Sequence, residues 1–178
     1  MVHQVEFEQW IPVPIGQVFL FFANPCNLPR IMPPQTGTEL VRLKLVPPPR
    51  SAEEHVTDRT FLAGIGSEIV TSFRPVSFLP LRAQWIALIT EFEWNHHFAD
   101  VQKSGPFKSF RHRHEVAEET RNQIRGTVIR DVIAYDVGFG RLGELAEKLF
   151  VNRQLQRTFE YRQKALEKLM GKAQGGGA

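Results

Sequence analysis

Polar and apolar residues alternate along most of the chain up to Val137, and the alternation stops near Phe139. A period of two is typical of β-strands that bury one face. It predicts seven strands, at residues 2–11, 38–46, 66–76, 82–94, 96–103, 107–118 and 123–137. The later strands are separated by short turn-like segments, and connections this short predict antiparallel neighbours.

Two short helices are predicted between the first and second strands. Pro14 suits the first position of a helix, and apolar residues follow it at helical spacing as far as Phe22. Residues 27–32 predict a second short helix, which Pro33 and Pro34 end.

A longer helix is predicted from about Phe139 onward, where the period becomes 3.6. It is amphipathic and roughly thirty residues long. The apolar residues assigned to its buried face are Leu142, Leu145, Leu149, Phe159, Leu166 and Met170.

These elements predict one α+β domain, because a large sheet beside one long helix must bury its apolar face on that helix. No repeat or linker divides the chain, so residues 1–172 are predicted to form a single domain and residues 173–178 a flexible tail. Residues 50–60 are polar and aperiodic, which predicts a surface loop whose removal costs little stability.

Composition narrows the function classes. The chain has 14 Phe and only 2 Tyr, which favours an apolar core or pocket, because Phe has no hydroxyl group that needs a hydrogen-bond partner. A net charge of +3 without a Lys/Arg run speaks against nucleic-acid binding. Cys26 is the single cysteine, which excludes an internal disulfide and a multi-cysteine metal site. No signal peptide or membrane-length apolar run is found, so we expect a cytoplasmic protein without stable membrane insertion.

Two histidines are the first candidates for chemistry. His112 and His114 alternate with Arg111, Arg113 and Glu115, and three charges in a row belong in solvent. Both imidazoles are therefore predicted to point inward, beside Phe110 on the same face. They could be structural, orient a ligand, or act as general acids or bases.

The hairpin that precedes these histidines has two possible registers. A two-residue loop at Gly105-Pro106 would pair His97 with His114 and gather three inward histidines, the minimum for zinc. A loop longer by one residue would instead turn Phe98, Asp100 and Gln102 inward. The residues themselves leave both registers open.

Further polar candidates lie on other elements. Asp131 and Tyr135 share one strand face, and a buried Asp needs partners, of which His112 is a plausible one. Asn152 and Gln156 interrupt the apolar face of the long helix, which suggests a water-lined cavity or a section that leaves the sheet. Another candidate inward face comprises Trp85, Ala87, Ile89 and Glu91.

Several short motifs, weak alone, resemble a known family through their order and spacing. They are Gln9-Trp10-Ile11-Pro12-Val13-Pro14, Val18-Phe19 with Phe22, Asn27-Leu28, Met32-Pro33-Pro34, Phe98 with Asp100 and Gln102, Gly105-Pro106-Phe107, His112-Arg113-His114, and Asp131 with Tyr135 and Gly138-Phe139-Gly140. The chain resembles the START-like superfamily, also called SRPBCC or Bet v 1-like, and within it the bacterial polyketide cyclase/dehydrase-type branch. Gly138 departs from the pattern, which has a proline there.

The resemblance implies a helix-grip fold, in which a seven-stranded curved antiparallel sheet surrounds the C-terminal helix and a cavity lies between them. It favours the register with Asp100 inward, and it places the Asp131 face inward. That register supplies only two inward histidines, so neither a metal nor another cofactor is expected.

The function implied first is binding of a small hydrophobic ligand that is polyketide-, lipid- or quinone-like. One alternative is a cyclase or dehydratase that moves protons with His112, His114 or Asp131. The other is a protein-interaction module whose cavity is filled by its own Phe residues. The predicted ligand contacts are Trp85, Phe98, Asp100, Gln102, Phe110, His112, His114, Asp131, Tyr135, Asn152 and Gln156; no catalytic residue is assigned.

Overall fold

One seven-stranded antiparallel sheet dominates the computed structural model, which describes residues 1–50, 58–76 and 81–171. Its spatial order is β1-β7-β6-β5-β4-β3-β2. All seven predicted strands are confirmed, with ends that differ by a few residues. They are β1 (His3–Ile11), β2 (Glu39–Lys44), β3 (Glu68–Phe73), β4 (Ala83–Glu93), β5 (His97–Ser104), β6 (Ser109–Arg121) and β7 (Ile124–Asp136). The predicted tail and most of the 50–60 loop lie outside the described residues.

The segment between β1 and β2 contains the two predicted short helices. These are α1 (Ile15–Ala23) and α2 (Leu28–Ile31), with single 3₁₀ turns at η1 (Pro25–Asn27) and η2 (Pro34–Thr36). Val18 and Phe19 of α1 are buried in the main core. The Asn24 side chain accepts a hydrogen bond from the Cys26 backbone N–H and so starts the η1 turn.

The C-terminal helix runs from Gly140 to Met170, as the change of period predicted, but a π-helical segment divides it. The parts are α3 (Gly140–Ala146), η3 (Glu147–Val151) and α4 (Asn152–Met170). No helix in the described ranges is long and apolar enough to cross a membrane.

The π segment corrects the predicted buried face. A π turn takes up extra residues, so it rotates the helix before it relative to the helix after it. Leu145 and Leu149, predicted to be buried, are 55% and 64% exposed, whereas Glu147 is only 5% exposed. Glu147 is tolerated inside because the Tyr135 hydroxyl donates a 2.9 Å hydrogen bond to its Oε1. Phe159 and Leu166 of α4 are buried as predicted.

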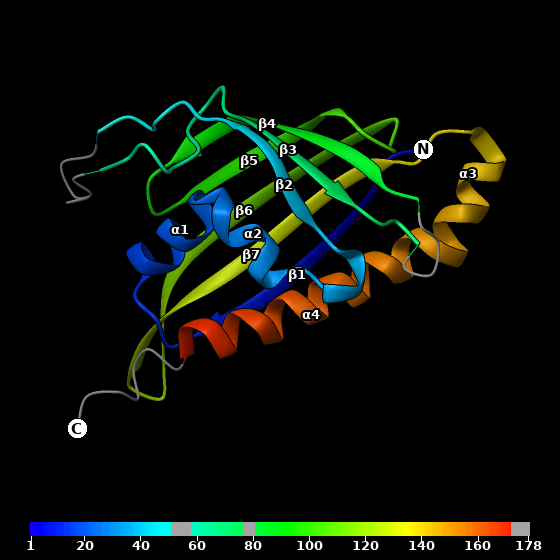
Figure 1. Cartoon of the computed structure of the whole chain (residues 1–178). Helices are drawn as coiled ribbons and strands as arrows, with labels where there is room; N and C mark the ends of the chain where they lie inside the picture. The colour runs from blue at the N-terminus through cyan, green and yellow to red at the C-terminus, as the bar shows by residue number, and fades with distance from the viewer. Residues whose placement is uncertain (51–57, 77–80, 172–178) are drawn as a thin grey trace.

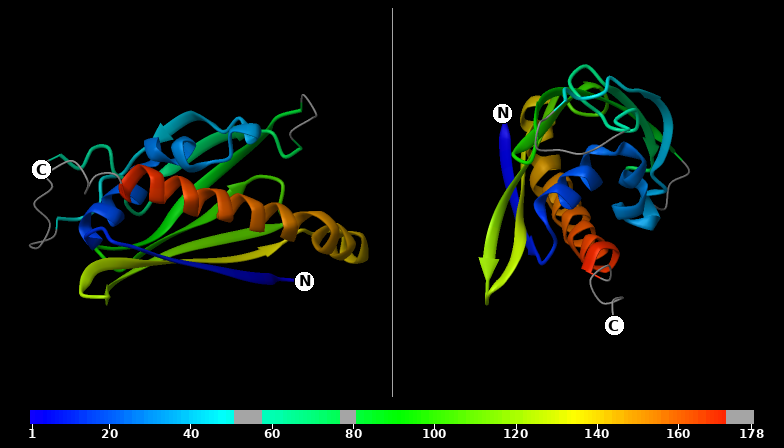
Figure 2. Two further views of the ribbon diagram at one scale, coloured as in Figure 1. Left: turned by 90° about the horizontal axis from the view of Figure 1, so that it is seen from below. Right: turned by 90° about the vertical axis from the view of Figure 1, so that its left-hand side faces the viewer.

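The sheet curves around α4, and α1 and α2 lie beside that helix on the same concave side (Figures 1 and 2). Two apolar clusters hold the layers together. In one, Phe19 of α1 packs among residues of β4 to β7 that include Ile89 and Phe98. In the other, the ring of Phe7 on β1 stacks on Phe159 of α4, with ring centres 4.3 Å apart.

Strand β4 carries two irregularities, and one of them corrects a predicted side-chain direction. Trp85 and Ile89 face the concave side, but the register with β5 shifts between Ile89 and Glu91. Glu91 therefore turns outward, where it accepts hydrogen bonds from Arg111 (2.6 Å) and Arg113 (3.2 Å). A β-bulge inserts one residue and so inverts the alternation in the rest of the strand.

The start of β7 requires a glycine because the end of β1, its neighbour in the sheet, lies close against it. A Cβ on Gly126 would lie 2.4 Å from the Ile11 carbonyl oxygen and 2.6 Å from the ring of Trp10. The Trp10 indole is fixed above Gly126, because its Nε1–H donates to the Glu119 carbonyl. Neither backbone nor ring can give way without loss of these contacts.

Gly126→Ala should therefore lower the free energy of unfolding by about 1–3 kcal/mol, the usual cost of overpacking a filled site. Urea denaturation followed by circular dichroism measures it. Gly171→Ala is the matched control, because its Cβ would meet nothing within 4 Å. Equal stability of the two variants would show that β1 and β7 are not in close contact at Gly126.

Candidate functional site

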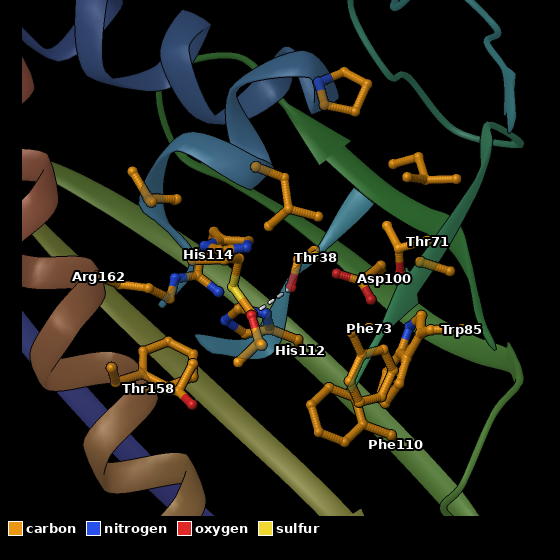
Figure 3. Close-up of a pocket in the computed structure, with 18 of the residues that line it drawn as sticks. Thr38, Thr71, Phe73, Trp85, Asp100, Phe110, His112, His114, Thr158 and Arg162 are labelled. Atoms are coloured by element: carbon orange, nitrogen blue, oxygen red, sulfur yellow. Dashed lines mark hydrogen bonds between the residues drawn. The ribbon is translucent and has the colours of Figure 1, made fainter. Parts of the chain in front are cut away.

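A cavity of about 460 Å³ lies between the concave face of the sheet, the α1–α2 segment and α4 (Figure 3). Its walls are mostly apolar. Phe73, Trp85, Phe107 and Phe110 form one aromatic end, in which the Trp85 and Phe110 rings meet edge to face at 4.7 Å. Such a wall gives affinity for apolar molecules without directing their orientation.

The polar corner of the cavity is formed by β5 and β6. Asp100 pairs with His112 and Phe98 pairs with His114 in the ladder between these strands, so all four side chains lie on the cavity side. This is the second of the two registers that the sequence allows. Gln102 helps to set it, because its amide accepts from the Phe107 N–H and donates to the Phe107 carbonyl across the turn.

Asp131 lies on β7, directly behind the two histidines. Its Oδ1 is 2.9 Å from His112 Nε2, in hydrogen-bond geometry, and 2.5 Å from His114 Nδ1. The second contact is close, but its alignment does not meet the directional requirement of a hydrogen bond. A carboxylate only accepts, so both contacts favour a proton on the nitrogen that faces Asp131. The Nδ1 of His112 and the Nε2 of His114 make no contact with Asp131.

The environment fixes the charges of this corner. Burial, together with the neighbouring His114, lowers the pKa of His112 to about 4, against the opposing effect of Asp131, so His112 is neutral at pH 7. Burial alone would raise the pKa of Asp131, but the adjacent His114 and His112 hold it well below its usual value. Asp100 has no such donor, and burial raises the pKa of its carboxyl group.

Aromatic neighbours hold both imidazole rings in place. The ring of His114 stacks on Phe98 at 4.5 Å and lies 5.3 Å from the ring of Phe22. His112 meets Phe159 edge to face at 5.6 Å, and the centres of the two imidazoles are 3.9 Å apart. The polar corner is therefore pre-organised by its packing as well as by Asp131.

The helix supplies different polar residues from those predicted. Asn152 and Gln156 are absent from the cavity lining, whereas Gln154, Thr158 and Arg162 belong to it. The prediction assumes one continuous helical face, but the π segment rotates the cavity-facing side of α4 relative to the residues that precede it. Thr158 and Arg162 are four residues apart and therefore share one face of the helix, and this spacing is the signal in the sequence that could have identified Arg162.

The remaining predicted contacts divide into two groups. Trp85, Phe98, Asp100, Phe110, His112 and His114 line the cavity. Gln102, Asp131 and Tyr135 do not, and each has a supporting contact instead: Gln102 with the turn, Asp131 with the histidines and Tyr135 with Glu147. The structure thus brings six of the predicted residues to one cavity and leaves these three outside its lining.

This corner can bind polar groups in several ways. A neutral imidazole offers a lone pair to a ligand hydroxyl, and Arg162 offers guanidinium N–H donors. Asp100, His112 and His114 also present one potential metal-ligand atom each, and these atoms all lie within 4.8 Å of one another.

Asp131→Ala should lower the free energy of unfolding by about 1–3 kcal/mol, because it strands the buried His112 N–H without an acceptor. Chemical denaturation measures this loss. Glu118→Ala is the control: Glu118 also pairs with a cation, Arg125, but at an exposed position. An unchanged stability of the Asp131 variant would show that the pair with His112 does not support the sheet.

Comparisons with known proteins were made by sequence and by structure. No family model matches the chain, and no curated protein matches its sequence. Solved structures do match. TTHA0849 from Thermus thermophilus has 18% sequence identity and a TM-score of 0.58, and the match covers 97% of this chain and 99% of that chain. A START superfamily protein from Mycobacterium smegmatis has 13% sequence identity and a TM-score of 0.62, and the match covers 96% of this chain and 99% of that chain. Ara h 8.0201 also matches, with 13% sequence identity and a TM-score of 0.58, over 96% of this chain and 98% of that chain. The chain therefore has the START-like, helix-grip fold.

Proposed function

We propose that this protein binds a small, mainly apolar molecule that carries one polar or anionic end. The cavity itself carries this proposal: it is walled mostly by aromatic and aliphatic side chains, and its titratable side chains, Asp100, His112, His114 and Arg162, are grouped in one part of it. A volume of about 460 Å³ falls within the range of about 300–1,000 Å³ typical of small-molecule sites. Polyketide-, lipid- and quinone-like molecules all have the required combination of an apolar body and a few oxygen atoms.

Arg162 supports an anionic end. Its guanidinium lies in the cavity wall over the ring of Phe159, 4.6 Å from the ring centre, and no described residue accepts a hydrogen bond from it. Burial lowers the pKa of Arg162 while Asp131 and Asp100 raise it, and the guanidinium stays charged. A half-buried cation at a cavity wall is stabilised when a ligand or water supplies acceptors for its N–H groups.

The interaction-module alternative requires a cavity closed by the protein's own side chains. The Phe residues of this chain instead surround an open volume: Phe73, Phe107 and Phe110 form its wall rather than its filling. This favours ligand binding over a filled scaffold.

Enzymatic acid–base chemistry is the second candidate function, favoured by the contact between His112 and Asp131. A histidine whose ring is fixed by a carboxylate resembles a general base in its geometry. Native mass spectrometry of the complex, with chromatography of the released ligand, separates the two candidates. A binding protein returns its ligand unchanged, a dehydratase returns a product lighter by one water, and a cyclase returns an isomer of equal mass but different retention.

Ala87→Trp should abolish uptake of a neutral environment-sensitive dye such as Nile red, because the indole would occupy the cavity that Ala87 lines. Fluorescence titration measures it, with long-chain alcohols as displacing ligands for the unaltered protein. Leu88→Trp is the matched control, since Leu88 is the next residue on β4 and is absent from the lining. No dye uptake by the unaltered protein would contradict the proposed binding function.

Arg162→Gln should weaken binding of a long-chain carboxylate by about tenfold or more, because a hydrogen bond to a charged group contributes about 1.5–3 kcal/mol. Binding of the alcohol of the same chain length should change little. Arg157→Gln, at an exposed position on α4, is the control. Equal losses for the acid and the alcohol would show that Arg162 shapes the cavity rather than binding an anion.

A further inference from the structure

The polar corner has a feature that apolar ligand binding does not explain. The Asp100 side chain is half-buried at the cavity wall, and no described residue donates a hydrogen bond to its carboxylate. His112 and His114 lie beside it on the adjacent strand, and each of the three residues offers one potential ligand atom within 4.8 Å of the other two. A carboxylate in such a place needs a partner that the protein does not supply.

We propose that Asp100, His112 and His114 bind one divalent first-row transition-metal ion, with the coordination positions that remain open directed into the cavity. Two imidazole nitrogens and one carboxylate oxygen form a ligand set typical of zinc and non-haem iron sites. The histidines alone supply too few ligands for such an ion, and Asp100 is the third ligand that completes the set.

The distances suit this set. The three ligand atoms lie within 4.8 Å of one another. Bonds of about 2.1 Å to a common ion place two ligands at most about 4.2 Å apart. At tetrahedral angles the ligands lie about 3.4 Å apart, so the most distant pair must close by about 1.4 Å, which needs movements of under about 1 Å by each side chain. The Asp100 side chain is free to move because no described residue forms a hydrogen bond with it.

Asp131 occupies the position of an outer-shell carboxylate. Histidines that bind metals commonly direct their second ring nitrogen to a carboxylate, which fixes ring orientation and tautomer. Here one carboxylate contacts both rings, at 2.9 Å for His112 and 2.5 Å for His114. The stacking of Phe98 on His114 holds that ring in the same orientation.

The charge balance points the same way. When ionised, Asp100 and Asp131 carry two negative charges, and the Arg162 guanidinium interacts electrostatically with both of them. Together with Arg162 the two carboxylates carry one net negative charge, and a divalent ion changes this to one net positive charge. The open coordination positions can then accept an anionic oxygen from a cavity ligand, beside the Arg162 guanidinium.

The test is metal binding by the tag-free full-length chain, with no apolar ligand present, so that its result is independent of the proposed function. Protein stripped with a chelator is titrated with Co²⁺ while visible d–d absorption is recorded, and then with Zn²⁺ in competition. We expect one ion per chain by elemental analysis, a tetrahedral or five-coordinate Co²⁺ spectrum, and release of the ion on addition of Zn²⁺.

The variants locate the ion. Asp100→Asn, which keeps the shape of the side chain, and His114→Ala should each weaken Co²⁺ binding by about 100-fold or more, and Asp131→Asn by about 10–100-fold. His97→Ala is the control: His97 lies on β5 near the carboxylates of Glu91 and Glu93, on the opposite face of the strand from Asp100. The Co²⁺ affinity of the His97→Ala variant should stay within about twofold of that of the unaltered protein.

Two results would overturn the proposal. One is uptake of well under one ion per folded chain, which would mean that Asp100 keeps a proton instead of a metal. The other is Co²⁺ affinity that is unchanged in Asp100→Asn, or that is lost in His97→Ala, since either would place the ion elsewhere. Circular dichroism of each variant establishes that it is folded before its affinity is compared.

Discussion

The structure depends on a mismatch in width between a seven-stranded sheet and the helix that must cover it. Seven strands spaced about 4.8 Å apart span about 29 Å, whereas a helix with its side chains is about 10–12 Å across. Curvature brings the edges of the sheet toward α4, and α1 with α2 covers part of the remainder (Figure 2). The space left between the layers is a cavity of about 460 Å³. The cavity therefore results from covering a wide sheet with few helices.

A cavity of this kind tolerates polar groups only where they support one another. Asp131 is the centre of that support, because its one carboxylate contacts both imidazoles and keeps its negative charge in a buried position. The histidines in turn lie beside Asp100 in the cavity wall. A small ligand, a proton or a metal ion placed there meets a rigid polar surface within an otherwise apolar space, which favours one orientation of whatever binds.

Two local irregularities decide which side chains reach that space. The bulge in β4 sends Glu91 outward to Arg111 and Arg113, so the cavity side keeps Trp85 and Ile89 but loses a carboxylate. The π segment in the C-terminal helix leaves Leu145 and Leu149 exposed. After it, α4 brings Thr158 and Arg162 to the cavity in place of the predicted Asn152 and Gln156. Both irregularities add a residue to a regular repeat, and both thereby change the chemistry of the site.

Periodicity by itself determined the order of the elements, because alternation and 3.6-residue spacing are local properties of the chain. It also determined that His112 and His114 point inward. Arg111, Arg113 and Glu115 alternate with them and must face solvent, so the histidines take the inner face. Only the tertiary structure decided the partner of each residue. The hairpin register that puts Asp100 beside His112, the bulge before Glu91 and the π turn before Arg162 each depend on how elements pair and pack, which the alternation within one segment does not record. One residue more or less in a loop, bulge or turn costs little locally, yet it moves every later side chain to a different face.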